Sequence, residues 1–220
     1  MGEAENIKAR YENRKNLSVS YGDVYSKKIA EERNQVYRDV LATYFRNPAE
    51  IKFLEIGAGS GANLDFFKSA GILPENIFAN ELIEERVNQL RLNHPDIHIF
   101  PGNALDIPEE QKFDIIFQST VFTSILDDRF RQQLADKMVS MLKPGGIILW
   151  YDFIYNNPKN KDVKKVEIGE VKKLFSKLTF CRGQKITLAP PIGRKVKGLY
   201  GWFVFFPFLR SHYIAVLQKK

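Results

Sequence analysis

Residues 53–61, Phe-Leu-Glu-Ile-Gly-Ala-Gly-Ser-Gly, are the stretch that decides the fold. They begin as a short apolar strand, carry a carboxylate at Glu55 and end in three glycines that alternate with small residues. Glycines suit such a turn because the backbone must bend sharply and approach a ligand where a Cβ atom would clash. The pattern predicts a strand, then a ligand-holding loop that opens a helix. A tight turn that binds nothing is the alternative.

The spacing of the glycines separates classes of ligand. Dinucleotide-binding folds use G-x-G-x-x-G, with a helix N-terminus that faces a pyrophosphate. This chain has G-x-G-x-G and lacks the Gly-Lys-Ser/Thr of a phosphate-binding P-loop. Glu55 would repel a phosphate, but it suits a ligand that carries an ammonium and a sulfonium. The loop therefore favours a nucleoside ligand without phosphates over a nicotinamide dinucleotide.

A second carboxylate, Glu81, follows the next apolar run, twenty residues beyond Gly61. In nucleoside-binding α/β folds an acid at this point accepts both ribose hydroxyls, a bidentate pairing that a carboxylate is shaped to make. Loop spacing, Glu55 and Glu81 together predict the same ligand.

Short β-rich runs alternate with amphipathic helical stretches along the chain. Strands are predicted at 52–56, 77–80, 97–100, 113–118, 146–153, 181–188 and 212–218. Helices are predicted at 62–69, 84–93, 128–142 and 168–178, with one or two more within 22–45. This alternation predicts one α/β domain built on a parallel sheet that is covered on both faces, with the last strand antiparallel at or near an edge.

With these motifs in place, the chain resembles the class I, Rossmann-like S-adenosylmethionine-dependent methyltransferases. The resemblance covers residues 50–155 well and the remainder by topology. It implies a mostly parallel seven-stranded sheet with helices on both faces, in a cofactor-binding domain at 49–220 preceded by a helical lid at 1–48. It also implies S-adenosylmethionine as cofactor and S-adenosylhomocysteine as product.

The resemblance also implies a set of cofactor contacts. The glycine loop and Glu55 would lie beneath the methionine part, and Glu81 would bind the ribose. Asn103 stands where the family has an adenine-binding acid, and its amide oxygen is expected to accept from the adenine amino group. Tyr21 and Tyr25 precede the loop, where the family often forms a lid. The predicted cofactor-binding residues are Glu55, Gly57, Ala58, Gly59, Gly61, Glu81, Leu82, Asn103, Ala104, Gln118, Tyr21 and Tyr25.

The methyl acceptor and the catalytic groups are less plainly encoded. Residues 118–122, Gln-Ser-Thr-Val-Phe, lack the Asn/Asp-Pro-Pro-aromatic motif that N-methyltransferases of nucleobase or amide nitrogens often carry, so that class is disfavoured. Metal assistance is disfavoured, because Asp128 is better explained as a helix N-cap, and no metal is predicted. The candidate bases are Asp152 and Tyr155, which leave the fifth strand where ligands of open sheets gather, and His212 in the last strand. The structural alternatives are a cap or turn for Asp152 and a satisfied core or edge histidine for His212.

The segment at 190–210 joins a basic cluster to a run of aromatic residues. It is either packed on the sheet or exposed as an interfacial patch or acceptor cleft. With Trp150-Tyr151-Asp152-Phe153, it is similar to methyltransferases associated with bacterial surface polysaccharides. This softer resemblance favours O-methylation of a sugar or a lipid-linked saccharide. The alternatives are a small-metabolite or RNA methyltransferase, a non-catalytic S-adenosylmethionine-binding partner and a nucleotide-dependent oxidoreductase.

The composition gives information about the partners and the cellular compartment of the protein. The formal charge of +7 raises the odds of an anionic partner, although the chain has no separate RNA-binding module and nucleic acid is disfavoured. A single cysteine, Cys181, precludes an internal disulfide and fits a reducing compartment. No apolar run reaches the roughly 18 residues of a membrane span. We expect a cytoplasmic monomer or homodimer, with peripheral contact to the inner membrane face through 190–210.

Overall fold

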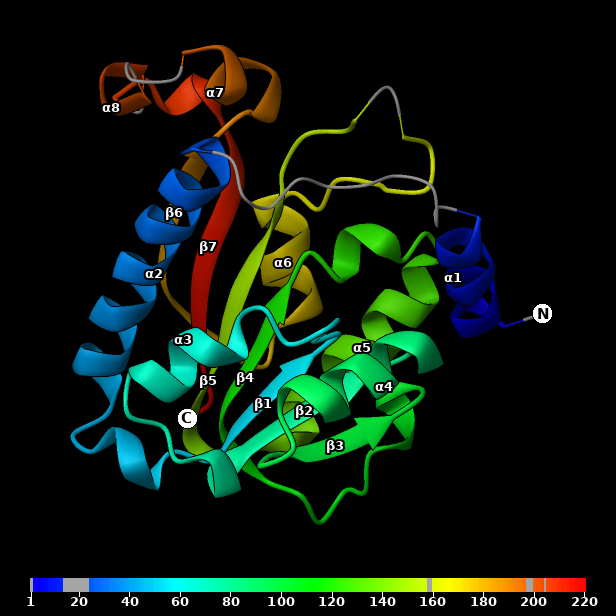
Figure 1. The fold of residues 1–220 in the computed structure, drawn as a ribbon. Helices are drawn as coiled ribbons and strands as arrows, with labels where there is room; N and C mark the ends of the chain where they lie inside the picture. The colour runs from blue at the N-terminus through cyan, green and yellow to red at the C-terminus, as the bar shows by residue number, and fades with distance from the viewer. Residues whose placement is uncertain (1, 14–23, 158–159, 197–199, 204) are drawn as a thin grey trace.

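A seven-stranded sheet forms the centre of the computed structural model, which describes residues 2–13, 24–157, 160–196, 200–203 and 205–220 (Figure 1). The strand order is β3-β2-β1-β4-β5-β7-β6. The strands are β1 (Phe53–Ile56), β2 (Ile77–Glu81), β3 (His98–Pro101), β4 (Phe113–Ser119), β5 (Leu142–Phe153), β6 (Thr179–Leu188) and β7 (Arg210–Gln218).

The sheet is mostly parallel. Strands β1 to β5 run in one direction, and β7 lies antiparallel between β5 and β6. The chain leaves β1 to form β2 and β3 on one side and returns to place β4 on the other, so the carboxyl ends of β1 and β4 mark the point where the strand order reverses. Open α/β sheets bind ligands in the crevice at such a point. The predicted sheet, with an antiparallel last strand near one edge, is confirmed.

Helices cover both faces of the sheet. The larger ones are α1 (Glu3–Glu12), α2 (Val24–Tyr44), α4 (Glu84–Asn93) and α5 (Asp128–Met141). The shorter ones are α3 (Leu64–Ser69), α6 (Ile168–Leu174), α7 (Pro190–Val196) and α8 (Tyr200–Phe203). None of the helices in the described ranges is long and apolar enough to cross a membrane.

Strand β1 shows how the alternation of side chains builds two cores. Leu54 and Ile56 pack in the core that α5 and α6 cover. Phe53 packs in the other core, beneath α2 and α3. Glu55 is fully buried, and because side chains alternate along a strand it shares the α2 side with Phe53. This assignment decides which helices contact the predicted cofactor-binding carboxylate.

The start of α5 corrects one detail of the sequence interpretation. The N-cap is Asp127, whose Oδ1 accepts from the backbone N–H of Phe130 at 2.6 Å. Asp128, which was expected to be the cap, is the first helical residue, and its carboxylate accepts from Lys164 Nζ at 2.7 Å. Two consecutive aspartates at a helix start leave the choice between them open in the sequence.

Candidate functional site

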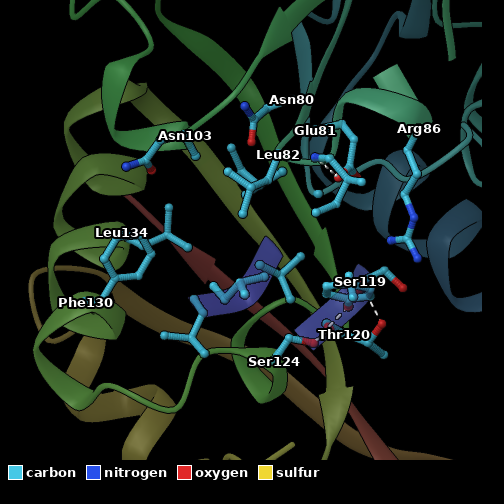
Figure 2. Close-up of a pocket in the computed structure, with 18 residues that line it drawn as sticks. Asn80, Glu81, Leu82, Arg86, Asn103, Ser119, Thr120, Ser124, Phe130 and Leu134 are labelled. Atoms are coloured by element: carbon cyan, nitrogen blue, oxygen red, sulfur yellow. Dashed lines mark hydrogen bonds between the residues drawn. The ribbon is translucent and has the colours of Figure 1, made fainter. Parts of the chain in front are cut away.

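A pocket opens at the carboxyl ends of β1, β2 and β4, where the strand order reverses. Figure 2 shows Glu81, Leu82 and Arg86 on one wall, Asn103 and Phe130 on another, and Ser119, Thr120 and Ser124 below. Its lining residues are Ile7, Tyr11, Ile56, Gly57, Asn80, Glu81, Leu82, Ile83, Arg86, Asn103, Ala104, Ser119, Thr120, Val121, Ser124, Ile125, Phe130 and Leu134.

The three loop glycines have positive φ angles, +68° at Gly57, +61° at Gly59 and +92° at Gly61. A Cβ atom on Gly57 would lie 2.5 Å from Val121 Cγ2, and one on Gly61 would lie 2.3 Å from His94 Nε2. At Gly59 no protein atom lies within 4 Å of the added carbon. Two glycines are therefore required by protein packing, whereas Gly59 leaves open space above the loop.

Glu81 holds the loop in place. Its Oε2 accepts from the Gly59 N–H at 2.7 Å and its Oε1 from the Ile83 N–H at 2.8 Å. The neighbouring Ala58 N–H donates to Asn80 O at 2.9 Å, which ties the loop to the end of β2. A carboxylate offers about four acceptor sites, so each oxygen of Glu81 keeps one for a ribose hydroxyl. This carboxylate therefore makes two structural hydrogen bonds and also lines the pocket.

Asn103 also has a structural bond in addition to its predicted role. Its Oδ1 accepts from the Leu105 N–H at 3.1 Å and caps the short helix η3 (Ala104–Asp106). One lone pair of the oxygen expected to face adenine is thus already used, and a bond to the adenine amino group would use the other. Ala104, which follows it, lines the same part of the pocket.

Glu55 belongs to a buried polar cluster beneath the loop. Its Oε1 accepts from Asn63 Nδ2 at 2.7 Å. Within the described ranges, its Oε2 has no hydrogen-bond partner, nor do the buried atoms Tyr37 Oη and Arg33 Nε of α2. Burial raises the pKa of Glu55 to about 8, against the opposing effects of Asn63 and Arg33. Buried polar atoms are nearly always paired, so three unpaired ones indicate a ligand or water at this place.

Gln118 acts as a brace within the fold. It is fully buried, accepts from the Val121 N–H at 3.0 Å and donates to Tyr151 O at 3.3 Å. It does not line the pocket, where Ser119, Thr120 and Val121 take the place predicted for it. Thr120 has φ +59°, a left-handed conformation that costs a non-glycine residue about 1 kcal/mol or more. Gln118 stabilises this strained turn.

The structure places the candidate base Asp152 away from the pocket. Its carboxylate is fully buried and accepts from Thr123 Oγ1 at 2.7 Å, from the Thr123 N–H at 3.2 Å and from the Phe153 N–H at 2.8 Å. Burial raises the pKa of Asp152 to about 6. These bonds clamp the end of β5 to the short helix η4 (Phe122–Ser124), which is a structural role.

The other two candidate bases are also outside the pocket. Tyr155 is 47% exposed, and its hydroxyl lies 3.4 Å from Lys185 Nζ. His212 is buried between β5 and β6, stacked on Tyr151 with ring centroids 4.8 Å apart. Burial lowers the pKa of His212 to about 3. Neither side chain lies where it would take a proton from a molecule in the pocket.

Tyr25, one of the two tyrosines predicted to cover the cofactor, does not line the pocket either. Tyr25 is buried against Leu188, with its hydroxyl donating to the Leu188 carbonyl at 2.6 Å, and a Cβ on Gly193 would lie 2.1 Å from its ring. Tyr21 lies outside the described residues. The position of Tyr25 is explained by packing against the segment between β6 and β7.

Helix α1, which lies within the predicted lid at 1–48, covers the pocket, although the sequence interpretation named none of its residues. Ile7 and Tyr11 line the pocket, and Tyr11 Oη lies 3.1 Å from Ser124 Oγ. Arg10 donates to the Ser124 carbonyl at 2.9 Å, and Arg86 lies 4.5 Å from the centroid of the Tyr11 ring. Ile7 and Tyr11 are four residues apart and so lie on one helical face, which the sequence spacing shows. The neighbouring sequence does not indicate which part of the protein this face contacts.

Comparisons with known proteins agree with this geometry. Residues 53–146 match the model of a family described as a methyltransferase domain. None of the curated proteins matches the chain in sequence. The chain is similar in structure to the N-methyltransferase NodS from Bradyrhizobium japonicum WM9 solved with S-adenosylhomocysteine, with TM-score 0.70, 14% identity, and coverage of 97% of this chain and 98% of that one.

Two further solved structures have the same fold. The magnesium protoporphyrin IX methyltransferase from Synechocystis PCC 6803, solved with S-adenosylhomocysteine, gives TM-score 0.67 at 10% identity and covers both chains fully. A putative sarcosine dimethylglycine methyltransferase from Galdieria sulphuraria gives TM-score 0.65 at 14% identity, over 99% of this chain and 98% of that one. The predicted Rossmann-like fold class is confirmed.

Proposed function

We propose that this S-adenosylmethionine-dependent methyltransferase transfers the methyl group to a small molecule that binds beneath α1 and needs no base from the enzyme. The observation that carries the proposal is the chemistry of the pocket wall. Among the described lining residues, Glu81 is the one carboxylate, and it is committed to the loop and the ribose position; no histidine lines the pocket. An amine or a carboxylate on the acceptor reacts without a protein base.

The sequence motifs and the pocket lining support one orientation for the proposed cofactor. Its adenosine would lie between Asn103 and Glu81, and its methionine part would lie on the glycine loop toward Glu55. The sulfonium methyl group would then face the turn after β4, near Thr120. The chemistry supplied by the bound cofactor is an in-line displacement at the methyl carbon, for which the main contribution of the protein is to position the acceptor.

The acceptor side combines hydroxyl groups with apolar surface. Ser119, Thr120 and Ser124 supply hydroxyls and Phe130 supplies an aromatic face (Figure 2). Tyr11 adds a further hydroxyl to the lining. Such a mixture suits a small molecule with both polar and apolar parts. Two of the structural relatives are named for small-molecule acceptors, magnesium protoporphyrin IX and sarcosine or dimethylglycine, which supports this size class.

A sugar hydroxyl, free or lipid-linked, is the second candidate acceptor. The hydroxyl-bearing and aromatic lining favours it, because aromatic rings pack on sugar faces while hydroxyls pair with hydroxyls. A sugar hydroxyl must lose its proton during transfer, however, and none of the three candidate bases lines the pocket. This candidate therefore ranks behind an amine or a carboxylate.

The experiment supplies methyl-labelled S-adenosylmethionine and the purified protein to separated pools of small amines and carboxylates, glycans and glycolipids, and RNA. We expect label in the first pool, and a rate whose pH profile follows the ionisation of the acceptor. Tyr11→Ala should raise the KM for the acceptor, while Tyr155→Phe serves as a matched control. Label in glycan supports the second candidate, and label confined to RNA contradicts both.

A further inference from the structure

The segment that connects β6 to β7 exposes an aromatic surface. Trp202, Phe205, Phe206 and Phe208 are 76%, 78%, 49% and 69% exposed, and we call these four side chains the aromatic patch. Helices α7 and α8 of this segment lie at one end of the molecule, beyond the ends of β6 and β7 (Figure 1). Large apolar side chains gathered at this level of exposure usually mark an interaction site.

Buried contacts fix the base of this segment. The Tyr200 hydroxyl donates to Glu32 Oε2 of α2 at 2.8 Å and accepts from the Leu188 N–H at 3.3 Å. The Ala189 N–H donates to the Leu209 carbonyl at 2.8 Å, and this bond joins the two ends of the segment where it leaves β6 and enters β7. Tyr200 itself is buried, in contrast to the patch beside it. The aromatic patch is therefore held outward on an anchored support.

The C-terminal stretch that carries the patch has charge of one sign in its own sequence. The last acidic residue of the sequence is Glu170, and residues 171–220 contain no Asp or Glu. Arg194 and Lys195 of α7 are exposed next to the patch in the chain. The cations of this stretch are Lys172, Lys173, Lys177, Arg182, Lys185, Arg194, Lys195, Lys197, Arg210, Lys219 and Lys220.

We propose that the aromatic patch and the cations of α7 dock the protein on an anionic lipid surface. Aromatic side chains, Trp above all, favour the boundary between headgroups and acyl chains, and Lys and Arg are attracted to acidic headgroups. A projecting support presents both kinds of side chain together. A protein partner would more commonly be met by charges of both signs around an apolar centre, and this stretch carries one sign only.

Docking would also orient the pocket. Strand β7 is antiparallel to β5, with His212 opposite Phe153, so the segment before β7 leaves the sheet at the carboxyl edge of the parallel strands. The pocket opens at that same edge. A membrane bound through the aromatic patch would therefore lie on the side of the molecule where the acceptor enters.

Vesicle flotation with the full chain tests the proposal. The protein should float with vesicles of phosphatidylcholine mixed with phosphatidylglycerol, stay behind with phosphatidylcholine alone, and lose binding as salt is raised. The triple variant Trp202→Ala, Phe205→Ala, Phe208→Ala and the double variant Arg194→Glu, Lys195→Glu should each weaken binding about tenfold or more. The matched control is Arg91→Glu with Leu92→Ala, an exposed cation and an exposed apolar side chain on α4.

Three outcomes would overturn the proposal. They are no binding to the anionic vesicles, binding that the patch variants leave unchanged, and a wild-type dimer that the patch variants convert to monomer. The last would assign the patch to a second copy of the chain. Calorimetry with S-adenosylhomocysteine shows whether each variant keeps a folded cofactor site, so that failure of membrane docking is distinguished from failure of the proposed function.

Discussion

Replacing Glu55 by Gln should stabilise the free protein and weaken cofactor binding. The fully buried Glu55 is ionised less readily than in the unfolded chain, because burial raises its pKa from 4.5 to about 8. As pH rises above 4.5, the unfolded state loses a proton that the folded state keeps, so the free energy of unfolding falls until pH reaches about 8. At pH 7 the interval is 2.5 pH units, which at 1.36 kcal/mol each corresponds to about 3 kcal/mol.

Gln keeps the shape of Glu and can still accept from Asn63, but it does not ionise. Glu55→Gln should therefore raise the free energy of unfolding at pH 7 by up to about 3 kcal/mol and flatten its decline between pH 5 and 8. Urea unfolding at several pH values measures both quantities. Glu109→Gln, a change at an exposed carboxylate, is the matched control.

The same variant should bind S-adenosylhomocysteine more weakly, since the proposed partner of Glu55 is the ammonium of the methionine part. In the wild type, that ammonium should draw about one proton off Glu55 near pH 7, which calorimetry in two buffers of different ionisation heat detects. A variant that is less stable than the wild type, or that keeps its pH dependence, would refute the reasoning about burial. Unchanged affinity and proton release would refute the contact.

Three further perturbations test other parts of the site. Gly61→Ala should lower the free energy of unfolding by about 2 to 4 kcal/mol, because its Cβ meets the buried His94. Gly59→Ala should lower it by only about 1 kcal/mol but weaken S-adenosylhomocysteine binding about tenfold. Equal losses of stability in thermal unfolding would argue against this packing. Asp152→Asn should lower the melting temperature while leaving kcat within about threefold at a temperature where the variant is folded, and a far larger loss of kcat would return Asp152 to the chemistry. Burial lowers the pKa of His212 to about 3, so the unfolded chain binds a proton below pH 6.5 that the folded wild type does not bind. The free energy of unfolding of the wild type should therefore fall by about 2 kcal/mol between pH 6.5 and pH 5. Urea unfolding of His212→Phe should show that this fall is absent.

The cofactor side of the site could be largely predicted from the sequence because its determinants are local. Gly57, Gly59 and Gly61 form the sharp turn that the sequence predicted, with positive φ angles, and Glu81 ends its strand on the pocket wall. The α/β class and the parallel strands follow from the alternation of apolar runs with helices. The cofactor contacts themselves remain predictions, to be tested by binding.

The acceptor side could not be predicted because it depends on long-range contacts. Tyr11 meets Ser124 across 113 positions in the sequence, and no local pattern encodes that pairing. Asp152 was placed at the correct edge of the sheet, but whether its carboxylate faces the pocket or the backbone of η4 depends on a turn held by Gln118. An aspartate at the end of this strand has the same sequence context whether it serves as an exposed base or as a buried hydrogen-bond acceptor.

The position of β7 has a consequence for synthesis of the chain. This strand pairs with β5 on one side and β6 on the other, so the sheet has a gap until residues 210–218 are available. Because the N-terminal part of the chain leaves the ribosome first, β1 to β4 can pair early. The facing edges of β5 and β6 stay unpaired until Gln218 has left the exit tunnel. We expect stalled chains that end before Arg210 to require chaperones, although they already contain the whole glycine loop.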